Sequence, residues 1–359
     1  MLNVTESFLP PFEEYSAILK RAWDKKWLTN NGELVQELEQ KLKDYLGVKH
    51  CLFTTNGTIV LQMALKCLKA PAGSEVITTP FSYVATTNSI LWEGLTPVFV
   101  DINNKDFCID SELIESAITE KTVAILATHV YGNPCAIEKI EAIGKKYNIK
   151  IIYDAAHAFG ATYKDRQILS YGNIVTCSFH ATKVFHTVEG GCIITNDDEI
   201  ANELYLMRQF GHIGDDYFSV GINGKNSEFH AAMGLANLKY VDEIIEKRKA
   251  VSKLYDEFLS DLFIRPIIKN QTIYNYAYYP IFFENEVQLL DGKLLLAKKE
   301  IFARRYFYPS LNKLPFILNN FTCSISEDYS RRALTLPLST NTSKEEVINI
   351  CNILNNILC

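Results

Sequence analysis

An aspartate and a lysine follow two predicted strands in the middle of the chain. Asp154 ends the apolar run IKIIYD, and Lys183 follows the apolar run IVTCSF, with Gly190 and Gly191 shortly beyond it. A lysine can bind an aldehyde cofactor covalently and move protons, and a carboxylate can keep a pyridine nitrogen protonated. The pattern therefore predicts a pyridoxal phosphate (PLP) site, with Lys183 as the Schiff-base lysine and Asp154 beside the pyridine nitrogen.

Each of these residues also has a simpler interpretation. Most lysines are solvated at the surface, an aspartate at a strand end can cap a helix, and Gly190-Gly191 can form a plain tight turn. The apolar strand before Lys183 and its small or aromatic neighbours argue against an ordinary surface position. Because Asp154 and Lys183 occur together at this separation, the PLP interpretation is favoured, and the two glycines then permit a close backbone approach.

A phosphate site is predicted far upstream, where the strand CLFTT is followed by Asn56-Gly57-Thr58 and an apolar helix. The start of a helix offers backbone N–H groups to an anion. We expect Gly57 and Thr58 to bind the phosphate together with Ser178, and Tyr83 to lie over the cofactor ring. Taken alone, an Asn-Gly-Thr turn is a weak signal, and a tyrosine at a strand-to-helix turn is more often simply packed.

Alternating apolar strands and helices must hold these residues in place. This alternation predicts an α/β fold with a mainly parallel, mixed sheet covered on both faces, in which ligands collect at the carboxyl ends of the strands. The predicted strands are 51–55, 75–79, 96–100, 123–128 and 149–154, and the predicted helices are 59–69, 84–92, 111–118 and 137–147.

Beyond residue 195 the pattern changes to longer helices and short aromatic strands. We predict a large α/β domain over residues 1–245, with an irregular N-terminal arm, and a smaller α+β domain over 246–359. Ser343 and Glu346 resemble a capping box. The further predicted helices are 199–210, a long run over 228–259, 291–300 and 343–358.

Composition excludes several classes of protein. The 359 residues carry a formal net charge of -6 without a basic stripe, so we expect no nucleic-acid partner. Neither a signal peptide nor a long apolar segment is present, so we expect no membrane span. The nine cysteines form no CxxC pair and the histidines show no ligand spacing, which favours reduced thiols in the cytoplasm and no metal site.

The run DAAHAFGATYKDRQILSYGN, followed by SFHATKVFHTVEGGCIITND, resembles the DegT/DnrJ/EryC1/StrS family of sugar-nucleotide aminotransferases. Further matches, including TTNGTIVLQMAL, THVYGNP, GINGKNSEFHAAMGLANL and RRYFYPSL, follow in the family's order from about residue 20 to the end. The resemblance implies PLP as cofactor and the type I fold of aspartate aminotransferase, with a large and a small domain.

The resemblance also implies roles for individual residues. Lys183 stands at the Schiff-base position, Asp154 at the pyridine-nitrogen position and His157 where the family contacts the cofactor's 3-hydroxyl. Asn223 matches an asparagine that reaches the phosphate from the neighbouring subunit, which implies a homodimer with sites at the interface. The remaining matched positions are Tyr83 for ring stacking and Thr58 with Ser178 for the phosphate.

Three positions depart from the family's pattern without removing a catalytic group. Asp165 stands where glycine is usual, Lys225 replaces a frequent arginine, and Asn173 replaces a frequent aspartate. A lysine rather than a histidine at position 183 disfavours the dehydratase offshoot of the family.

The activity implied is amino transfer from L-glutamate to a keto-sugar nucleotide, with pyridoxamine phosphate as the second cofactor form. The amino-acid sequence of the central run is most similar to the sequences of enzymes that convert dTDP-4-keto-6-deoxyglucose to the 4-amino-4,6-dideoxy sugar for surface polysaccharide such as O-antigen. His186 and Tyr308 are candidate sugar contacts, although both could be core packing. Alternatives are a dTDP-sugar 3-aminotransferase, a GDP-sugar 4-aminotransferase, a PLP sugar dehydratase and a non-catalytic sugar-nucleotide binding protein.

Overall fold

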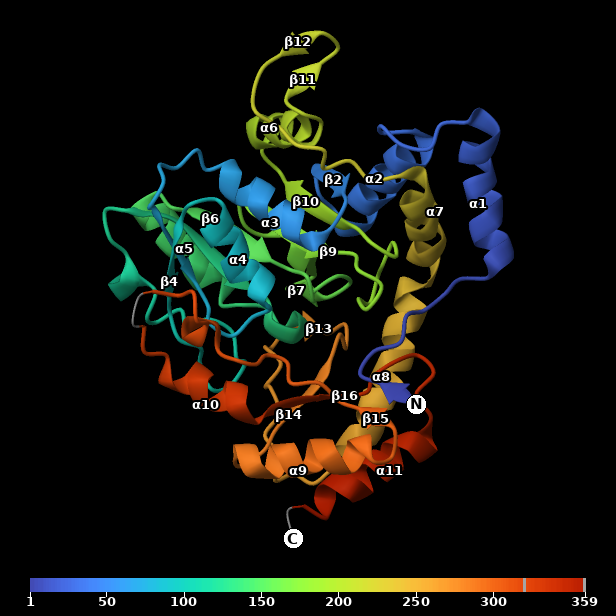
Figure 1. Cartoon of the computed structure of the whole chain (residues 1–359), viewed down its shortest axis with the longest axis vertical. Coiled ribbons are helices and arrows are strands. Elements are labelled where there is room, and N and C mark those ends of the chain that lie inside the picture. Colours follow the sequence, from blue (N-terminus) through green and yellow to red (C-terminus); the bar gives the residue numbers. More distant parts are fainter. Residues whose placement is uncertain (319–320, 358–359) are drawn as a thin grey trace.

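A seven-stranded sheet forms the centre of the protein in the computed structural model, which describes residues 1–318 and 321–357 (Figure 1). The strand order is β2-β10-β9-β6-β5-β3-β4. β10 runs antiparallel to β2 and to β9, and the other neighbouring pairs are parallel, which confirms the predicted mixed, mainly parallel sheet. The strands are β2 (His50–Thr54), β3 (Glu75–Thr78), β4 (Thr96–Phe99), β5 (Thr122–Thr128), β6 (Lys150–Asp154), β9 (Ile174–Ser178) and β10 (Gly191–Thr195).

Each face of the sheet has its own apolar core, because successive strand residues point to opposite sides. Leu52 and Ile152 pack with α3 (Gly57–Lys66) and α6 (Asp198–Arg208) on one face. Phe53 and Ile151 pack on the other face. The helices over this second face are α2 (Glu33–Leu46), α5 (Ile137–Tyr147) and α7 (Glu228–Asn237).

Two predicted helices differ from the structure. Residues 111–118 form turns and a short 3-10 helix, Glu115–Ala117. Side chains take up backbone amides at both ends of this segment, because the Asp110 carboxylate accepts a hydrogen bond from the Glu112 amide and the Thr122 hydroxyl accepts one from the Thr119 amide. The predicted run 228–259 is divided into α7 and α8 (Val241–Phe258) by a 3-10 turn at Leu238–Tyr240. α4 (Val84–Trp92) matches its predicted bounds.

A second core lies in the C-terminal part, around the antiparallel pair β14 (Tyr279–Phe282) and β16 (Ala333–Leu336). The predicted boundary at residue 245 lies inside α8, whose Ile245 joins the first core and whose Val251 joins the second, so the exact division stays a prediction. The helices that pack on this core include α9 (Glu286–Ala297) and α11 (Lys344–Asn355), and α11 begins with the predicted Ser343–Glu346 capping box. α10 (Ser324–Arg332) packs against the first core through Ile325 and Tyr329.

The N-terminal residues, predicted as part of the large domain's arm, lie partly against the C-terminal part. β1 (Leu2–Asn3) pairs in parallel with β15 (Ile301–Phe302), because its backbone groups complete the edge of that short strand. The arm then enters α1 (Phe12–Lys25), in agreement with the short helical pattern that the sequence shows around Tyr15–Trp27, and this helix packs beside α7 (Figure 1).

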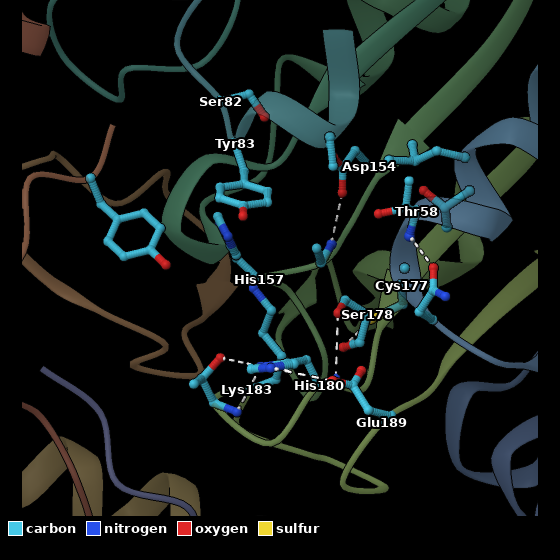
Figure 2. Close-up of a pocket in the computed structure, with 18 of the residues that line it drawn as sticks. Thr58, Ser82, Tyr83, Asp154, His157, Cys177, Ser178, His180, Lys183 and Glu189 are labelled. Carbon is cyan, nitrogen blue, oxygen red and sulfur yellow. Dashed lines mark hydrogen bonds and ion pairs between the residues drawn. The ribbon is translucent and has the colours of Figure 1, made fainter. Parts of the chain in front are cut away.

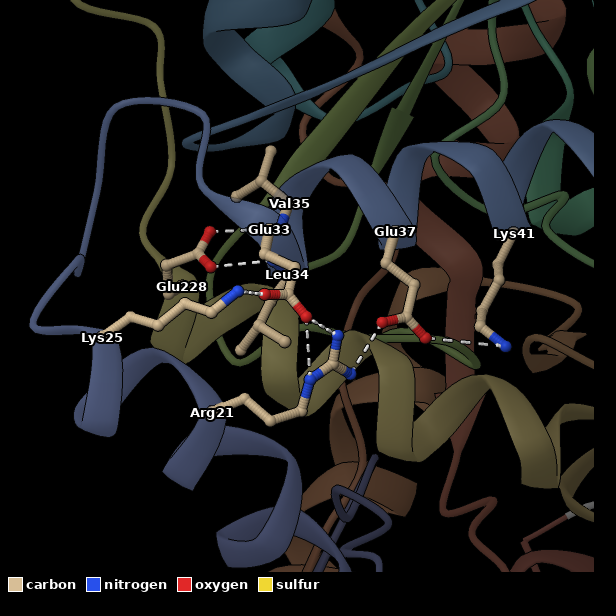
Figure 3. A network of polar contacts seen from close by, with 8 residues as sticks. All are labelled: Arg21, Lys25, Glu33, Leu34, Val35, Glu37, Lys41 and Glu228. Carbon is tan, nitrogen blue, oxygen red and sulfur yellow. Dashed lines mark hydrogen bonds and ion pairs between the residues drawn. The ribbon is translucent and has the colours of Figure 1, made fainter.

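The start of α2 is held by a buried carboxylate from α7 (Figure 3). Glu228 accepts hydrogen bonds from the amides of Leu34 at 2.8 Å and Val35 at 3.1 Å. A side chain on Gly32 would collide with this carboxylate, since a Cβ there would lie 2.6 Å from the Glu228 carboxyl carbon. α2 and α7 are thus joined by polar contacts as well as by apolar packing.

The departures from the family pattern are accommodated locally. Lys164 and Asp165 both have positive φ, 50° and 59°, in the tight turn between β7 (Thr162–Tyr163) and β8 (Arg166–Gln167). Aspartate tolerates this left-handed conformation better than most residues. The Asn173 side chain accepts a hydrogen bond from the Ile151 amide at 2.8 Å, and the Lys225 ammonium lies over the Phe210 ring.

Over residues 1–318 and 321–357, no helix is long and apolar enough to cross a membrane. In the same residues no group of three histidine, cysteine or acidic side chains could hold a metal ion.

Candidate active site

A cavity of about 380 Å³ lies where β6 and β9 end and α3 and α4 begin (Figure 2). Since parallel strands bring their carboxyl ends to one edge of a sheet, side chains far apart in the sequence meet here. Seven of the predicted cofactor residues line this cofactor cavity: Gly57, Thr58, Tyr83, Asp154, His157, Ser178 and Lys183.

Lys183 lies half-buried in the cofactor cavity after the end of β9. Its Nζ donates a hydrogen bond to the Tyr278 hydroxyl at 3.4 Å. Burial opposes the charge on this amine, but the nearby Tyr278, Tyr306 and Asp154 outweigh it and hold the pKa of Lys183 above its ordinary value. The lysine is therefore an ammonium at neutral pH in the protein alone, held among phenol rings.

Asp154 is buried and is held by fixed donors at the end of β6. The Thr86 hydroxyl donates to one carboxylate oxygen at 2.8 Å, and the Ala156 amide donates to the other at 3.1 Å. Burial raises the pKa of Asp154 above its ordinary value, while these donors and the charge of Lys183 oppose that rise.

A chain of hydroxyl groups leads to Asp154. Ser82 lies 2.8 Å from Thr86 and 3.0 Å from Thr128, oxygen to oxygen. Because an ionised Asp154 can only accept, Thr86 must donate to it, Ser82 must donate to Thr86, and Thr128 must donate to Ser82. One ionised carboxylate thus fixes the direction of three buried hydroxyls.

His157 is buried beside Lys183, with its ring against Tyr278 and stacked on Phe307. Burial, and then the charge of Lys183, hold the pKa of His157 well below its ordinary value, so the imidazole is neutral. Its buried Nδ1 has no hydrogen-bond partner in the described chain. A buried nitrogen without a partner is costly and points to a polar group that enters the cavity.

The start of α3 lies against the end of β9. A Cβ added at Gly57 would lie 2.7 Å from the Ser178 Cβ, so only glycine fits between the helix start and this strand. The Asn56 side chain accepts from the amides of Thr58 at 3.0 Å and Ile59 at 2.9 Å. The helix start is therefore less free than the sequence predicted, and Thr58 is left to offer its exposed hydroxyl rather than its amide.

Gly190 and Gly191 are required by close packing, as the sequence predicted. A Cβ on Gly191 would lie 2.7 Å from the backbone carbonyl of Asn56, and one on Gly190 would collide with the Thr187 hydroxyl. Gly191 lets β10 approach the turn before α3, whose residues Asn56 and Gly57 line the cofactor cavity.

Several residues of the site could not be identified from the sequence. Thr86 follows Tyr83 by about one helical turn, which is a weak signal on its own. Tyr278, Arg304 and Tyr306 come from the C-terminal part of the chain; Arg304 and Tyr306 belong to the matched run RRYFYPSL, whereas no signal in the sequence pointed to Tyr278. Tyr306 and Arg304 line the cofactor cavity itself.

Three predicted residues lie outside the cofactor cavity. Asn223 is exposed in the loop before α7, where it pairs with Gln209. His186 is buried and its Nε2 donates to the Phe8 carbonyl at 2.6 Å. Tyr308 is half-exposed beneath the Arg305 guanidinium and lines a neighbouring cavity. Their roles stay predictions.

The residues present fit a pyridoxal phosphate molecule. The cofactor cavity offers a lysine amine, a buried carboxylate and a neutral imidazole whose Nδ1 needs a partner. Thr58 of α3 and Ser178 of β9, two elements that approach closely at Gly57, add two hydroxyl groups to the lining of the cavity. These are the groups that such a cofactor needs for its aldehyde, ring nitrogen, 3-hydroxyl and phosphate.

The central sheet, the second α+β core and this site are those of an aminotransferase of the type I fold. The chain belongs to the DegT/DnrJ/EryC1/StrS aminotransferase family, whose model matches residues 12–355. It is 40% identical to a dTDP-4-amino-4,6-dideoxy-D-glucose transaminase of Shigella dysenteriae over 95% of both chains. It is 32% identical to a GDP-perosamine synthase of Escherichia coli O157:H7 over 92% of both chains.

A solved structure has the same fold. DesI, crystallised in the presence of its TDP-sugar product, superposes with a TM-score of 0.92 at 29% identity, covering 100% of this chain and 92% of that one. The family resemblance and the fold class predicted from the sequence are both confirmed.

Proposed function

We propose that the protein is a PLP-dependent aminotransferase that moves an amino group from L-glutamate to dTDP-4-keto-6-deoxy-D-glucose, giving dTDP-4-amino-4,6-dideoxy-D-glucose. The observation that carries the proposal is the meeting of Lys183, Asp154 and His157 in one cavity, in a chain 40% identical to a transaminase of that name. The bound cofactor supplies an electron sink for the substrate carbon that loses its proton.

Lys183 moves the proton. Its Nζ stands at the end of a flexible chain, within hydrogen-bond reach of Tyr278. As the neutral amine, which it would be when released from the bound cofactor, it could take a proton from the carbon that bears the amino group and return it on the other side of the transfer. Tyr278 orients the amine and offers it a polar partner between these events.

Asp154, His157 and the hydroxyl pair hold the cofactor. The Asp154 carboxylate, fixed by Thr86 and Ala156, would pair with the protonated ring nitrogen. His157 Nδ1 would contact the 3-hydroxyl, and Thr58 with Ser178 would bind the phosphate. Tyr83 at the start of α4 would cover the ring.

We further propose a homodimer in which Asn223 completes the partner's phosphate site, acting in the cytoplasm on the route to O-antigen or a similar surface polysaccharide. Exposed apolar side chains near Asn223 and on α1 support such an interface. They include Tyr217 (76% exposed), Val220 (83%) and Trp23 (64%).

A GDP-linked 4-keto sugar is the second candidate substrate, because the chain is also similar to a GDP-perosamine synthase. Its lower identity, 32% against 40%, favours the dTDP sugar.

The test is to incubate the purified protein with PLP, L-glutamate and each keto-sugar nucleotide. We expect an amino sugar from the dTDP substrate, 2-oxoglutarate in equal amount, and no product with Lys183→Ala. A wild-type protein that consumes no glutamate with any of the sugars would disprove the proposal.

A further inference from the structure

Arg304 is a charged side chain of the cofactor cavity that no step above uses. It lies on the C-terminal part of the chain, where its backbone is fixed by hydrogen bonds in both directions with Thr335 of β16, at 3.1 Å and 2.8 Å. Its guanidinium lies over the Tyr306 ring, 4.5 Å from the ring centre. The side chain is therefore held at a defined place on the wall of the cavity.

The guanidinium of Arg304 has free donors. Within residues 1–318 and 321–357 it makes no side-chain hydrogen bond and no ion pair, whereas the adjacent Arg305 binds the Glu286 carboxylate at 2.6 Å and the Arg331 carbonyl at 2.7 Å. The acidic residues of the cavity have other partners, since Asp154 is held by Thr86 and Glu189 faces His180 at 3.6 Å. A guanidinium with five N–H donors on a cavity wall is suited to a planar oxyanion.

Arg304 also lines a second, neighbouring cavity. A second cavity of about 240 Å³, which we call the side cavity, adjoins the cofactor cavity, and Ser82, Tyr83, Arg304 and Tyr306 line both. The rest of the side cavity includes Arg305, Tyr308 and Leu311. A ligand that reaches from one cavity into the other passes the residues that line both, and Arg304 is the only one of these four that carries a positive charge.

We propose that Arg304 is the anion-recognition residue for the substrates, binding the oxyanion group that each of them carries. The inference rests on the proposed function, because both substrates must enter this cavity. L-Glutamate carries carboxylates and the sugar nucleotide carries a diphosphate, and either group can accept two parallel N–H bonds from a guanidinium. Arg304 touches the substrate and takes no part in proton transfer.

Direct binding to the PLP-loaded protein tests this with two unreactive probes, glutarate for the carboxylate and dTDP for the diphosphate. Isothermal titration compares the wild type with Arg304→Met and Arg304→Lys. The matched control is Arg331→Met, which removes the same charge from an exposed arginine of α10. Circular dichroism and cofactor absorbance establish that each variant is folded and loaded.

We expect Arg304→Met to weaken binding of one or both probes by about tenfold to a hundredfold, Arg304→Lys to weaken it less, and Arg331→Met to leave it unchanged. Loss with glutarate alone identifies the amino donor's carboxylate, loss with dTDP alone identifies the diphosphate, and loss with both shows that Arg304 serves each substrate in turn. Equal affinity in the wild type and Arg304→Met, or a wild type that binds neither probe, overturns the proposal.

The two proposals fail in different ways. Neither probe reacts, so a change in affinity is measured whether or not transfer occurs. Failure of the proposed function is seen instead as a wild-type enzyme that forms no amino sugar.

Discussion

The buried carboxylate of Asp154 depends on one hydroxyl that the sequence did not identify. Burial alone would favour the neutral acid, and Thr86 and Ala156 oppose this by donating to the two oxygens. The neighbouring Thr87 is also buried, but its hydroxyl has no partner in the described chain. The two threonines therefore form a matched pair for mutation.

We predict that Thr86→Val weakens PLP binding by about tenfold or more, because a hydrogen bond to a charged group contributes about 2 kcal/mol. Thr87→Val removes an unpaired hydroxyl of the same size and should leave affinity unchanged. The measurement is the dissociation constant of PLP from spectroscopic titration. Equal affinities in the two variants would show that Thr86 does not support Asp154.

The lowered pKa of His157 predicts how the free energy of unfolding depends on pH. Burial, aided by the Lys183 charge, holds the pKa of His157 well below its ordinary value. On acidification the imidazole therefore takes up a proton in the unfolded chain at a pH at which it is still neutral in the folded protein. The unfolded state then binds more protons below about pH 6.5, and the free energy of unfolding falls as the pH drops through that value.

We predict that His157→Gln makes this acid loss shallower, by up to about 1.4 kcal/mol for each pH unit below about 6.5. Urea unfolding of both proteins at about pH 7.5 and about pH 5.5 measures the difference in slope. His186 and His230, whose pKa values burial also lowers, are present in both proteins and cancel in the comparison. Parallel slopes would mean that His157 is protonated in the folded state.

At the scale of elements, the site depends on a contact between a helix start and a strand end. α3 and β9 approach so closely at Gly57 that a methyl group would lie 2.7 Å from the Ser178 Cβ and 3.2 Å from its Cα. This packing sets the spacing between the hydroxyls of Thr58 and Ser178, which we propose bind the phosphate.

We predict that Gly57→Ala lowers the free energy of unfolding by about 1–3 kcal/mol through overpacking and weakens PLP binding. The double variant Gly57→Ala/Ser178→Gly removes the nearest colliding atoms and should recover part of the stability, though not the Ser178 hydroxyl. Chemical denaturation compares the variants. A single variant as stable as the wild type would show that the helix start can shift freely.

The start of α2 gives an independent prediction about stability. Glu228→Ala leaves the buried amides of Leu34 and Val35 without a charged acceptor, so we expect a loss of about 3 kcal/mol in the free energy of unfolding. Glu37→Ala, which breaks a half-exposed contact between α2 and Arg21 of α1, should cost less than about 1 kcal/mol (Figure 3). Similar losses in both variants would contradict this account of the cap.

The sequence identified what local patterns encode and missed what depends on distant packing. Asp154 and Lys183 were predicted because each follows an apolar strand that forms. The chain of Thr128, Ser82 and Thr86 depends on strand order, because β5 lies between β6 and β3, and no local pattern encodes that order. The helix expected over 111–118 failed because side chains bond its backbone into turns.

In the whole molecule, the cofactor cavity lies between two parts of one chain. The end of β6 supplies Asp154, the segment after β9 supplies Lys183, and the C-terminal part supplies Tyr278, Arg304 and Tyr306. α8 contributes to both apolar cores, and β1 ties the N-terminus to β15 (Figure 1). These links between the two parts hold the amine of Lys183 within hydrogen-bonding distance of the Tyr278 hydroxyl.

Covalent attachment of PLP to Lys183 can be measured directly. Borohydride treatment of the PLP-loaded protein makes the bond between PLP and a lysine permanent, and peptide mass spectrometry then locates the attached pyridoxyl group. We predict that the group is found on the peptide containing Lys183 and is absent from Lys183→Ala. Attachment to another lysine, or none in the wild type, would contradict the account.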